Sequence, residues 1–280
     1  MSTMTSHPAG RARGGLGQSA TDGLLVAWRN LKRVPRIPEL AIFAILQSIM
    51  FVLLFAFVFG GAIPIPGYPD PNAYREFLMP GIFGQTIVFA AATTAIGMAD
   101  DTHKGIIDRF RSLPMARSAV LTGRALADVV YNLGILIVLI VSGFAVGWTV
   151  HTGVPSLVGG IALLLLFAFA MSWLGIWMGL NVPSVEVAQQ VIFTVLFPIT
   201  FLSNVFVPPQ TLPDWLQPIA EWNPTSTLTG ALREMWGNPN PYASDSFPGQ
   251  NPVLVTLIWV VVIIAIFGPL GVRRYRSMSR

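Results

Sequence analysis

The sequence has no cysteine, only two lysines and few charged residues of any kind. Without cysteine, disulfides and thiolate metal sites are excluded. Charged residues make up 11% of the chain, against roughly 25% in ordinary soluble domains, whereas hydrophobic residues make up 53%. This deficit indicates that most of the surface does not face water. We therefore predict an all-α polytopic membrane protein.

The sequence also lacks the motifs of common enzyme sites. Neither lysine lies in a loop ending G-K-[ST], so the chain cannot be a P-loop ATPase by itself. The three histidines form no HExxH pattern, and there is no G-x-S-x-G elbow. The apolar stretches hold almost no ionisable groups, which disfavours a proton-coupled transporter. We therefore expect no enzyme activity, no metal and no cofactor in this chain.

Six apolar stretches are long enough to cross a bilayer, which needs about 20 helical residues. They cover about 39–61, 77–99, 125–150, 156–180, 186–207 and 252–272, within a transmembrane domain at 37–272. Residues 1–20 form a polar tail for which we predict disorder, and 273–280 form a C-terminal tail. No signal-peptide core follows the first tail, so we expect no cleaved signal.

The basic residues indicate how the chain crosses the membrane. The N-terminal part carries six, loop 100–124 five and the C-terminal end four, whereas the opposite side has only Arg75 and Arg233. Lysine and arginine accumulate on the cytoplasmic side. We therefore expect both termini and loop 100–124 in the cytoplasm, and 62–76 and 208–251 outside. This topology explains the net charge of +4 without nucleic acid.

Two further regions are predicted as amphipathic helices. Residues 21–36 have an apolar face bordered by basic side chains, as in a helix lying on the cytoplasmic leaflet. Its notable side chains are Trp28, Arg29, Lys32 and Arg33. Residues 208–251 have two apolar stripes at helical spacing and several tryptophans. They predict two short helices, with Thr211 and Thr225 as N-caps, that dip into the outer leaflet or cap the spans.

Asp100–Arg124 is the only long charged segment within the apolar middle of the chain. Its sequence K-G-I-I-D-R-F-R-S-L-P predicts a short amphipathic helix that Pro114 ends. The residues of its apolar face are Ile106, Ile107, Phe110 and Leu113. A charged helix between two spans is suited to receive a push from a soluble partner. The alternative is that its charges merely hold the loop in the cytoplasm.

Two of the predicted spans carry uncharged polar residues along one helical face. Such side chains turn away from lipid, where they would lack partners. A face that mixes amides and aromatic rings suits an amphiphilic organic solute, and helix–helix packing is the alternative. The candidate substrate-path residues are Gln85, Phe89, Thr93, Gln190, Thr194, Phe197, Phe201 and Asn204. The spacings Gly143-x-x-x-Gly147 and Gly175-x-x-x-Gly179 would also allow helices to approach closely.

The chain resembles the membrane subunits of ABC-2 type exporters, most closely the daunorubicin-resistance type permeases of actinobacteria. The most specific parts are KGIIDRFRSLPMARSAVLTGR at 104–124 and FPITFLSNVFVPPQTLPDWLQPIAEWNP at 197–224. The resemblance covers nearly the whole chain, from about residue 21 to the last span. It implies the six-helix ABC-2 exporter fold, with a connecting helix at 21–36 and a coupling helix in loop 100–124.

The resemblance also implies partners that this chain does not contain. Two permease copies, as a homodimer, would form the pathway, and two copies of a separate ABC ATPase would hold ATP and magnesium. The residues expected to dock the ATPase are Lys104, Gly105, Asp108, Arg109, Arg111 and Pro114. The turn at 181–186 is expected to add a smaller contact. Membrane lipids would surround the complex in a bacterial cell membrane.

The expected function is export of an amphipathic drug, natural product or lipid from the cytoplasm or inner leaflet. Relatives that export polysaccharides or lipid-linked glycans are one alternative, although the spans show no pattern typical of a sugar track. A membrane enzyme or scaffold that transports nothing is another. Its acids would be Asp214, Glu221 and Glu234 on the outer side, which lack metal-ligand spacing.

Overall fold

The computed structural model describes residues 46–47, 49–54, 57, 67–68, 70, 73–107, 117–206, 209–241 and 243–278. In this part of the chain, all elements are helices. The long helices are α3 (Ala73–His103), α5 (Arg117–Ala145), α6 (Val154–Asn181), α7 (Val185–Phe201) and α11 (Pro252–Ser277). The short ones are η3 (Pro209–Thr211), α8 (Gln217–Glu221), α9 (Pro224–Trp236) and α10 (Phe247–Gln250).

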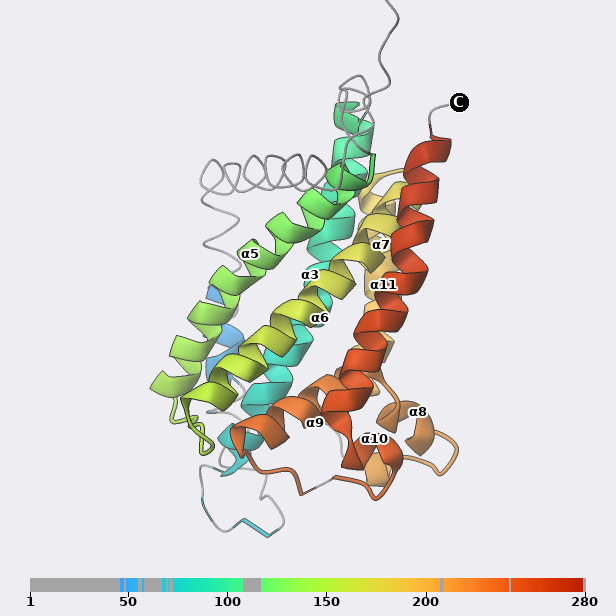
Figure 1. Cartoon of the computed structure of the whole chain (residues 1–280). Coiled ribbons are helices and arrows are strands. Elements are labelled where there is room, and N and C mark those ends of the chain that lie inside the picture. Colours follow the sequence, from blue (N-terminus) through green and yellow to red (C-terminus); the bar gives the residue numbers. More distant parts are fainter. Residues whose placement is uncertain are drawn as a thin grey trace, which may run out of the picture.

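The long helices form an elongated bundle, and α8, α9 and α10 gather at one end of it (Figure 1). At the other end, which we call the basal end, α3 and α11 finish and α5 begins (Figure 1). Among the described residues, four helices are long and apolar enough to cross a membrane: α3, Val120–Ala145 of α5, α6 and α11. They lie over the expected spans 77–99, 125–150, 156–180 and 252–272.

Two of the expected spans differ from these four. The first, at 39–61, is described only in part and is helical at 46–47 and 49–54. The fifth, at 186–207, is the shorter apolar helix α7, which ends at Phe201. Its 17 residues cover about 25 Å at 1.5 Å per residue, less than the roughly 30 Å of a hydrocarbon core. The chain is irregular from Leu202 to Phe206.

Helix α3 is the central helix of the bundle. In its apolar stretch of 18 residues, 67% of the residues are buried, against 28% in the corresponding stretches of α5 and α11. Helix α6 lies closest to α3 where glycines leave space between the two backbones. A Cβ atom at Gly175 would lie 2.5 Å from the carbonyl oxygen of Ala91, and one at Gly179 would overlap the carbonyl oxygen of Ala95. The Gly175-x-x-x-Gly179 spacing therefore does bring two helices together.

We expect Gly179→Val to lower the unfolding free energy by about 2 kcal/mol, because the added carbons would force α3 and α6 apart. The melting temperature of the purified chain in detergent measures this effect. The control is Gly134→Ala in α5, where no atom lies within 4 Å of the added carbon. It should leave the melting temperature unchanged or slightly higher, since alanine favours helix. Equal losses in both variants would contradict the close contact.

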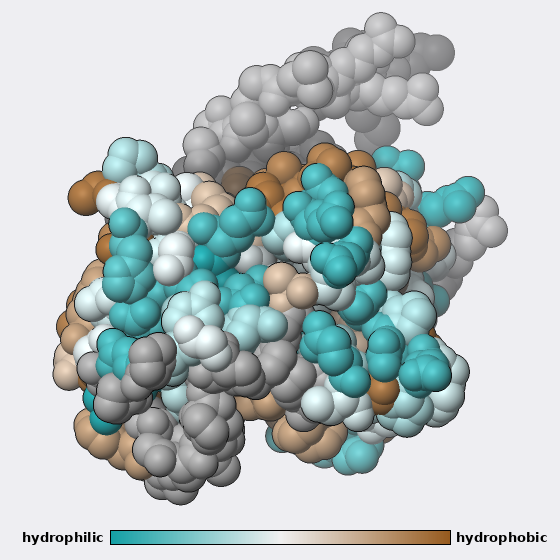
Figure 2. Space-filling model, turned by 90° about the horizontal axis from the view of Figure 1, so that it is seen from below, coloured by the Kyte–Doolittle hydropathy of each residue, from teal (hydrophilic) through white to brown (hydrophobic). Residues whose placement is uncertain are grey.

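The end of the bundle opposite the basal end holds a buried aromatic cluster. The ring centroids of Trp148 and Trp236 are 5.1 Å apart, and Phe83 lies 5.2 and 5.8 Å from them. The two indole N–H groups donate to Asn238 Oδ1 at 3.0 Å and to the Ser156 carbonyl at 3.2 Å. Seen from this end, the surface is mostly hydrophilic, with hydrophobic residues at its margins (Figure 2).

Helix α9 is buried on most sides and packs against α3, α6 and α11. It therefore caps the long helices from within the protein rather than lying in lipid. Its N-cap is Asn223, whose side-chain oxygen accepts a hydrogen bond from Thr225 N at 2.8 Å, so the expected cap at Thr225 is wrong by two residues. Thr211 ends η3 and caps no helix. Around α8, Trp215, Ile219 and Trp222 stay exposed.

Candidate functional site

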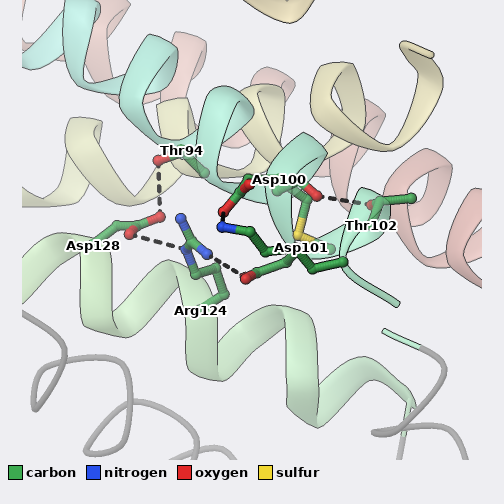
Figure 3. Close-up of polar contacts among 8 residues, drawn as sticks. Thr94, Asp100, Asp101, Thr102, Arg124 and Asp128 are labelled. Carbon is green, nitrogen blue, oxygen red and sulfur yellow. Dashed lines mark hydrogen bonds and ion pairs between the residues drawn. The ribbon is translucent and has the colours of Figure 1, made fainter. Parts of the chain in front are cut away.

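A network of charged side chains joins the basal ends of α3 and α5 (Figure 3). Arg124 Nη1 lies 3.0 Å from Asp101 Oδ2, and Arg124 Nε lies 3.3 Å from Asp128 Oδ1. The hydroxyl of Thr94 donates to Asp128 Oδ2 at 2.8 Å. We call these four residues the Arg124 cluster. Because Thr94 and Asp101 belong to α3 and the other two to α5, the cluster fastens these helices together.

The Arg124 cluster is largely shielded from water, since its three charged side chains are 13–18% exposed. Charges in such a place are stable only when they are paired and hydrogen-bonded. Gly97 provides the space, because a Cβ atom there would overlap Nη2 of Arg124. The pair Arg124–Asp128 also has the i, i+4 spacing of one helix face.

Helix α3 ends just beyond this cluster, at the start of the charged segment. Gly105 takes a left-handed conformation with φ of 64°, and its N–H donates to the Thr102 carbonyl at 3.1 Å. Such a glycine turns the chain out of a helix. Lys104 pairs with Asp100 at 2.7 Å, but both are exposed, so this pair contributes at most about 1 kcal/mol.

The remaining docking residues expected from the sequence are Asp108, Arg109, Arg111 and Pro114, and they lie outside the described residues. So do Trp28, Arg29, Lys32 and Arg33 of the expected connecting helix. The described segment resumes in α5, which carries Arg124. The Arg124 cluster therefore lies at the base of loop 100–124, where the loop leaves one long helix and enters the next.

The turn between α6 and α7 lies beside the same base. The imidazole of His103, the last residue of α3, forms a short hydrogen bond with the Pro183 carbonyl. Ser184 then begins α7 as its N-cap, accepting from Val187 N at 3.3 Å. The end of α3 is thus in contact with the residue that precedes α7.

The second candidate site is the face that α3 and α7 share. Phe89 and Phe193 lie 5.9 Å apart between ring centroids, and Phe197 stacks on Phe201 at 4.2 Å and 25°. Helix α7 is buried along one narrow stripe only, which consists of Ala188, Ile192, Leu196 and Thr200. The rest of α7 is largely exposed.

The structure separates the eight predicted path residues into two groups. The exposed ones are Thr93, Gln190, Thr194, Phe197 and Phe201, and Phe89 is half-buried beside them. Gln85 is instead buried at 7% exposure, and its Oε1 has no hydrogen-bond partner among the described residues. Asn204 lies beyond the end of α7, where its backbone contacts α9.

Arg233 was not among the residues predicted to be functional, because from the sequence it counts only as an outer charge. This arginine of α9 is fully buried. Its Nε donates to the Phe77 carbonyl at 2.9 Å, and both terminal nitrogens lie 3.3 Å from the Asn204 carbonyl. Its guanidinium also lies 3.7 Å above the Phe77 ring. It therefore ties the irregular end of α7 to the beginning of α3.

The Arg124 cluster was not predicted from the sequence either, although one of its two ion pairs could have been. The spacing of Arg124 and Asp128 indicates an intrahelical pair, but the partnership with Asp101 spans 23 positions and depends on the fold. Within the described residues, no group of three or more His, Asp or Glu side chains is placed to hold a metal ion.

The chain is similar in sequence to membrane subunits of ABC transporters. The family model described as ABC-2 type transporter matches residues 22–235. The daunorubicin resistance ABC transporter permease protein DrrB1 of Streptomyces coeruleorubidus is 31% identical over 252 residues, which are 90% of this chain and 85% of that protein. A probable doxorubicin resistance ABC transporter permease protein DrrC of Mycobacterium tuberculosis is 25% identical over 257 residues, covering 90% of this chain and 88% of that protein.

Proposed function

Because this chain belongs to the ABC-2 type transporter family, we propose that it is the membrane-spanning permease subunit of an ATP-driven exporter. The Arg124 cluster is the observation that supports this role best. It fastens together the two helices from which loop 100–124 emerges. A push on that loop would therefore move α3 and α5 as one unit instead of bending a free loop.

The energy would come from a separate ABC ATPase that binds at the basal end, two copies per complex, and holds ATP and magnesium. Lys104 is exposed at the base, as docking requires, and Gly105 beside it is half-buried. The sequence of 106–114 adds Asp108, Arg109 and Arg111. The contact of His103 with the α6–α7 turn would pass the same motion to α7.

A second copy of this chain would cover the open face of α7. Gln190 and Thr194 are exposed there in the middle of an apolar helix. An amide that faced hydrocarbon would lose its hydrogen bonds, which costs several kcal/mol. A facing α7 from a second permease would supply polar neighbours and enclose the aromatic rings. In this arrangement, the six spans of each copy place both termini in the cytoplasm of a bacterial cell.

The substrate we propose is an amphipathic drug-like molecule or a lipid. The relatives are named for resistance to daunorubicin and doxorubicin. The exposed α3–α7 face fits such a solute, because stacked rings contact apolar parts and nearby hydroxyls and amides contact polar parts. The tryptophans Trp148 and Trp236 are buried in the aromatic cluster at the end opposite the basal end, so they cannot line a sugar track.

The test is reconstitution of the complete exporter. The chain is produced in a bacterium together with an ABC ATPase, taken from beside its own gene where one is encoded there, and daunorubicin accumulation is followed by its fluorescence. We expect the ATPase to co-purify with the chain and cells to accumulate less daunorubicin than cells with either subunit alone. A chain that lowers accumulation without any ATPase would contradict the proposal, as would one that binds no ATPase.

Arg109→Glu is expected to abolish ATP-driven export while the chain still inserts into the membrane, because the reversed charge opposes docking of the ATPase. Daunorubicin accumulation measures export, and the amount of chain in washed membranes measures insertion. Asp214→Lys, a charge reversal at an exposed residue before α8, is the control outside loop 100–124 and should leave export unchanged. Normal export by Arg109→Glu would show that the docking face has been wrongly assigned.

A further inference from the structure

A second buried cluster lies at the basal end and includes part of the last turns of α11. These turns have no role in the coupling apparatus proposed above. Its buried members are Met98, Ile107, Val120, Leu121, Ala125, Trp173, Ile176, Leu180 and Tyr275. They come from α3, loop 100–124, α5, α6 and α11. We call this group the basal cluster. Ile107 lies in the described start of the predicted coupling helix, so the end of α11 and this residue share one packed core.

The end of α11 is held in this cluster and is more than a basic tail. Tyr275 is 1% exposed, whereas Arg273, Arg274 and Arg276 around it are exposed. Arg274 Nε also donates to the Leu180 carbonyl at 3.2 Å, at the end of α6. A tail that served only to keep the terminus in the cytoplasm would need neither contact.

Helix α11 is continuous from Pro252 to Ser277, but its hydrogen-bond ladder has a break at Gly268–Pro269, before the last turns. Pro269 lies inside the helix and follows Gly268, where an added Cβ atom would meet nothing within 4 Å. Proline removes one helical hydrogen bond, and such a pair is a common origin of kinks. The break is therefore a point at which α11 can bend when its last turns move with the base.

The other end of α11 contacts the helix that holds α7. Trp259 Nε1 donates to the Trp222 carbonyl at 2.9 Å, just before α9 begins. A Cβ atom at Gly230 of α9 would lie 3.3 Å from Pro252, the first residue of α11. Arg233 of α9 in turn binds the Asn204 carbonyl beyond α7. Helix α11 therefore connects the base of the bundle with the far end of α7.

We propose that the last turns of α11 are a second arm of the coupling apparatus, with Tyr275 as the residue that positions this arm against the coupling helix. A stroke delivered to loop 100–124 moves the basal cluster, and α11 carries that movement past the Gly268–Pro269 break toward α9. This inference rests on the proposed function. It adds a residue far from loop 100–124 in sequence whose loss uncouples ATP hydrolysis from export.

The test compares Tyr275→Ala with Tyr275→Phe in the complete exporter, using daunorubicin as the probe. We expect Tyr275→Ala to reduce daunorubicin export and its stimulation of ATP hydrolysis about tenfold, within the usual range of coupling between sites. The ATPase should still co-purify, and basal hydrolysis should persist. Tyr275→Phe keeps the ring and should restore both. Full export by Tyr275→Ala overturns the proposal, and so does loss of the ATPase from the purified complex.

If Tyr275→Ala does not fold, Pro269→Ala provides a second test of the same proposal. This variant restores a helical hydrogen bond, so the melting temperature should stay the same or rise. We expect weaker export because an α11 with an uninterrupted hydrogen-bond ladder bends less at this point when the base moves. Unchanged export by Pro269→Ala would contradict a role for the break. If the unmodified complex does not export, the proposed function itself fails, which separates the two outcomes.

Discussion

Replacing Arg124 with leucine is expected to lower the unfolding free energy by about 3 kcal/mol, since removing one partner of a buried ion pair leaves uncompensated charge. Asp101 and Asp128 would then share a shielded site without the guanidinium between them. Because the side chains are slightly exposed, we take the lower end of the range. The melting temperature of the purified chain should fall by about 6–10 °C. Export should fall more steeply, because α3 and α5 would no longer move together.

A matched series separates charge from packing. Lys104→Gln removes the exposed pair with Asp100 and should change stability by less than about 0.5 kcal/mol. The triple variant Asp101→Asn, Arg124→Leu, Asp128→Asn removes the unpaired charges and should regain part of the lost stability. It should not regain export if fastening α3 to α5 is the function of the cluster. A triple variant that exports normally would limit the role of the cluster to stability.

Replacing Arg233 with methionine is expected to have the second large effect, about 3 kcal/mol, because it leaves a buried carbonyl at Asn204 without its charged donor. The methionine fills much of the volume but cannot replace the hydrogen bonds to Phe77 and Asn204. We expect a local effect as well, since the irregular segment 202–206 would keep only the hydrogen bond from Asn204 N to Ser226 Oγ as its link to α9.

The absence of cysteine allows this local effect to be measured directly. Ser203, which is 2% exposed, becomes a single reporter as Ser203→Cys. Its modification by a maleimide should be about tenfold faster in the Arg233→Met background, which corresponds to local opening made easier by about 1.4 kcal/mol. Arg273→Met in the exposed end of α11 is the control and should leave the rate unchanged. Equal rates in all three proteins would show that Arg233 does not hold this segment.

Where the helices lie could be predicted from the sequence to a large extent. The uncharged stretches at 77–99, 156–180 and 252–272 have the length and composition of spans, and α3, α6 and α11 lie there. The early end of α7 at Phe201 was harder to predict, because 202–207 is as apolar as the helix before it. There, the Asn223 side chain donates to the Ile199 carbonyl and Asn204 N donates to Ser226 Oγ, and hydropathy does not record these bonds.

For the candidate sites as well, one part could be predicted from the sequence and another part could not. The exposed stripe of Gln190, Thr194, Phe197 and Phe201 follows from helical spacing alone. Gln85 and Asn204 were grouped with it, but one is buried and the other lies at the junction with α9. Helical periodicity shows which residues share a face, whereas the neighbours of that face depend on how the helices pack.

By itself, the sequence determined that the chain crosses a membrane, that it holds no nucleotide-hydrolysing loop, and that one long charged segment interrupts its apolar middle. These conclusions follow from composition and from the free energy of placing charge in lipid. Only the tertiary structure decided which charges meet. Asp101 pairs with Arg124, Arg233 reaches Asn204, and Tyr275 enters the core around Ile107, because helices distant in sequence place these residues side by side.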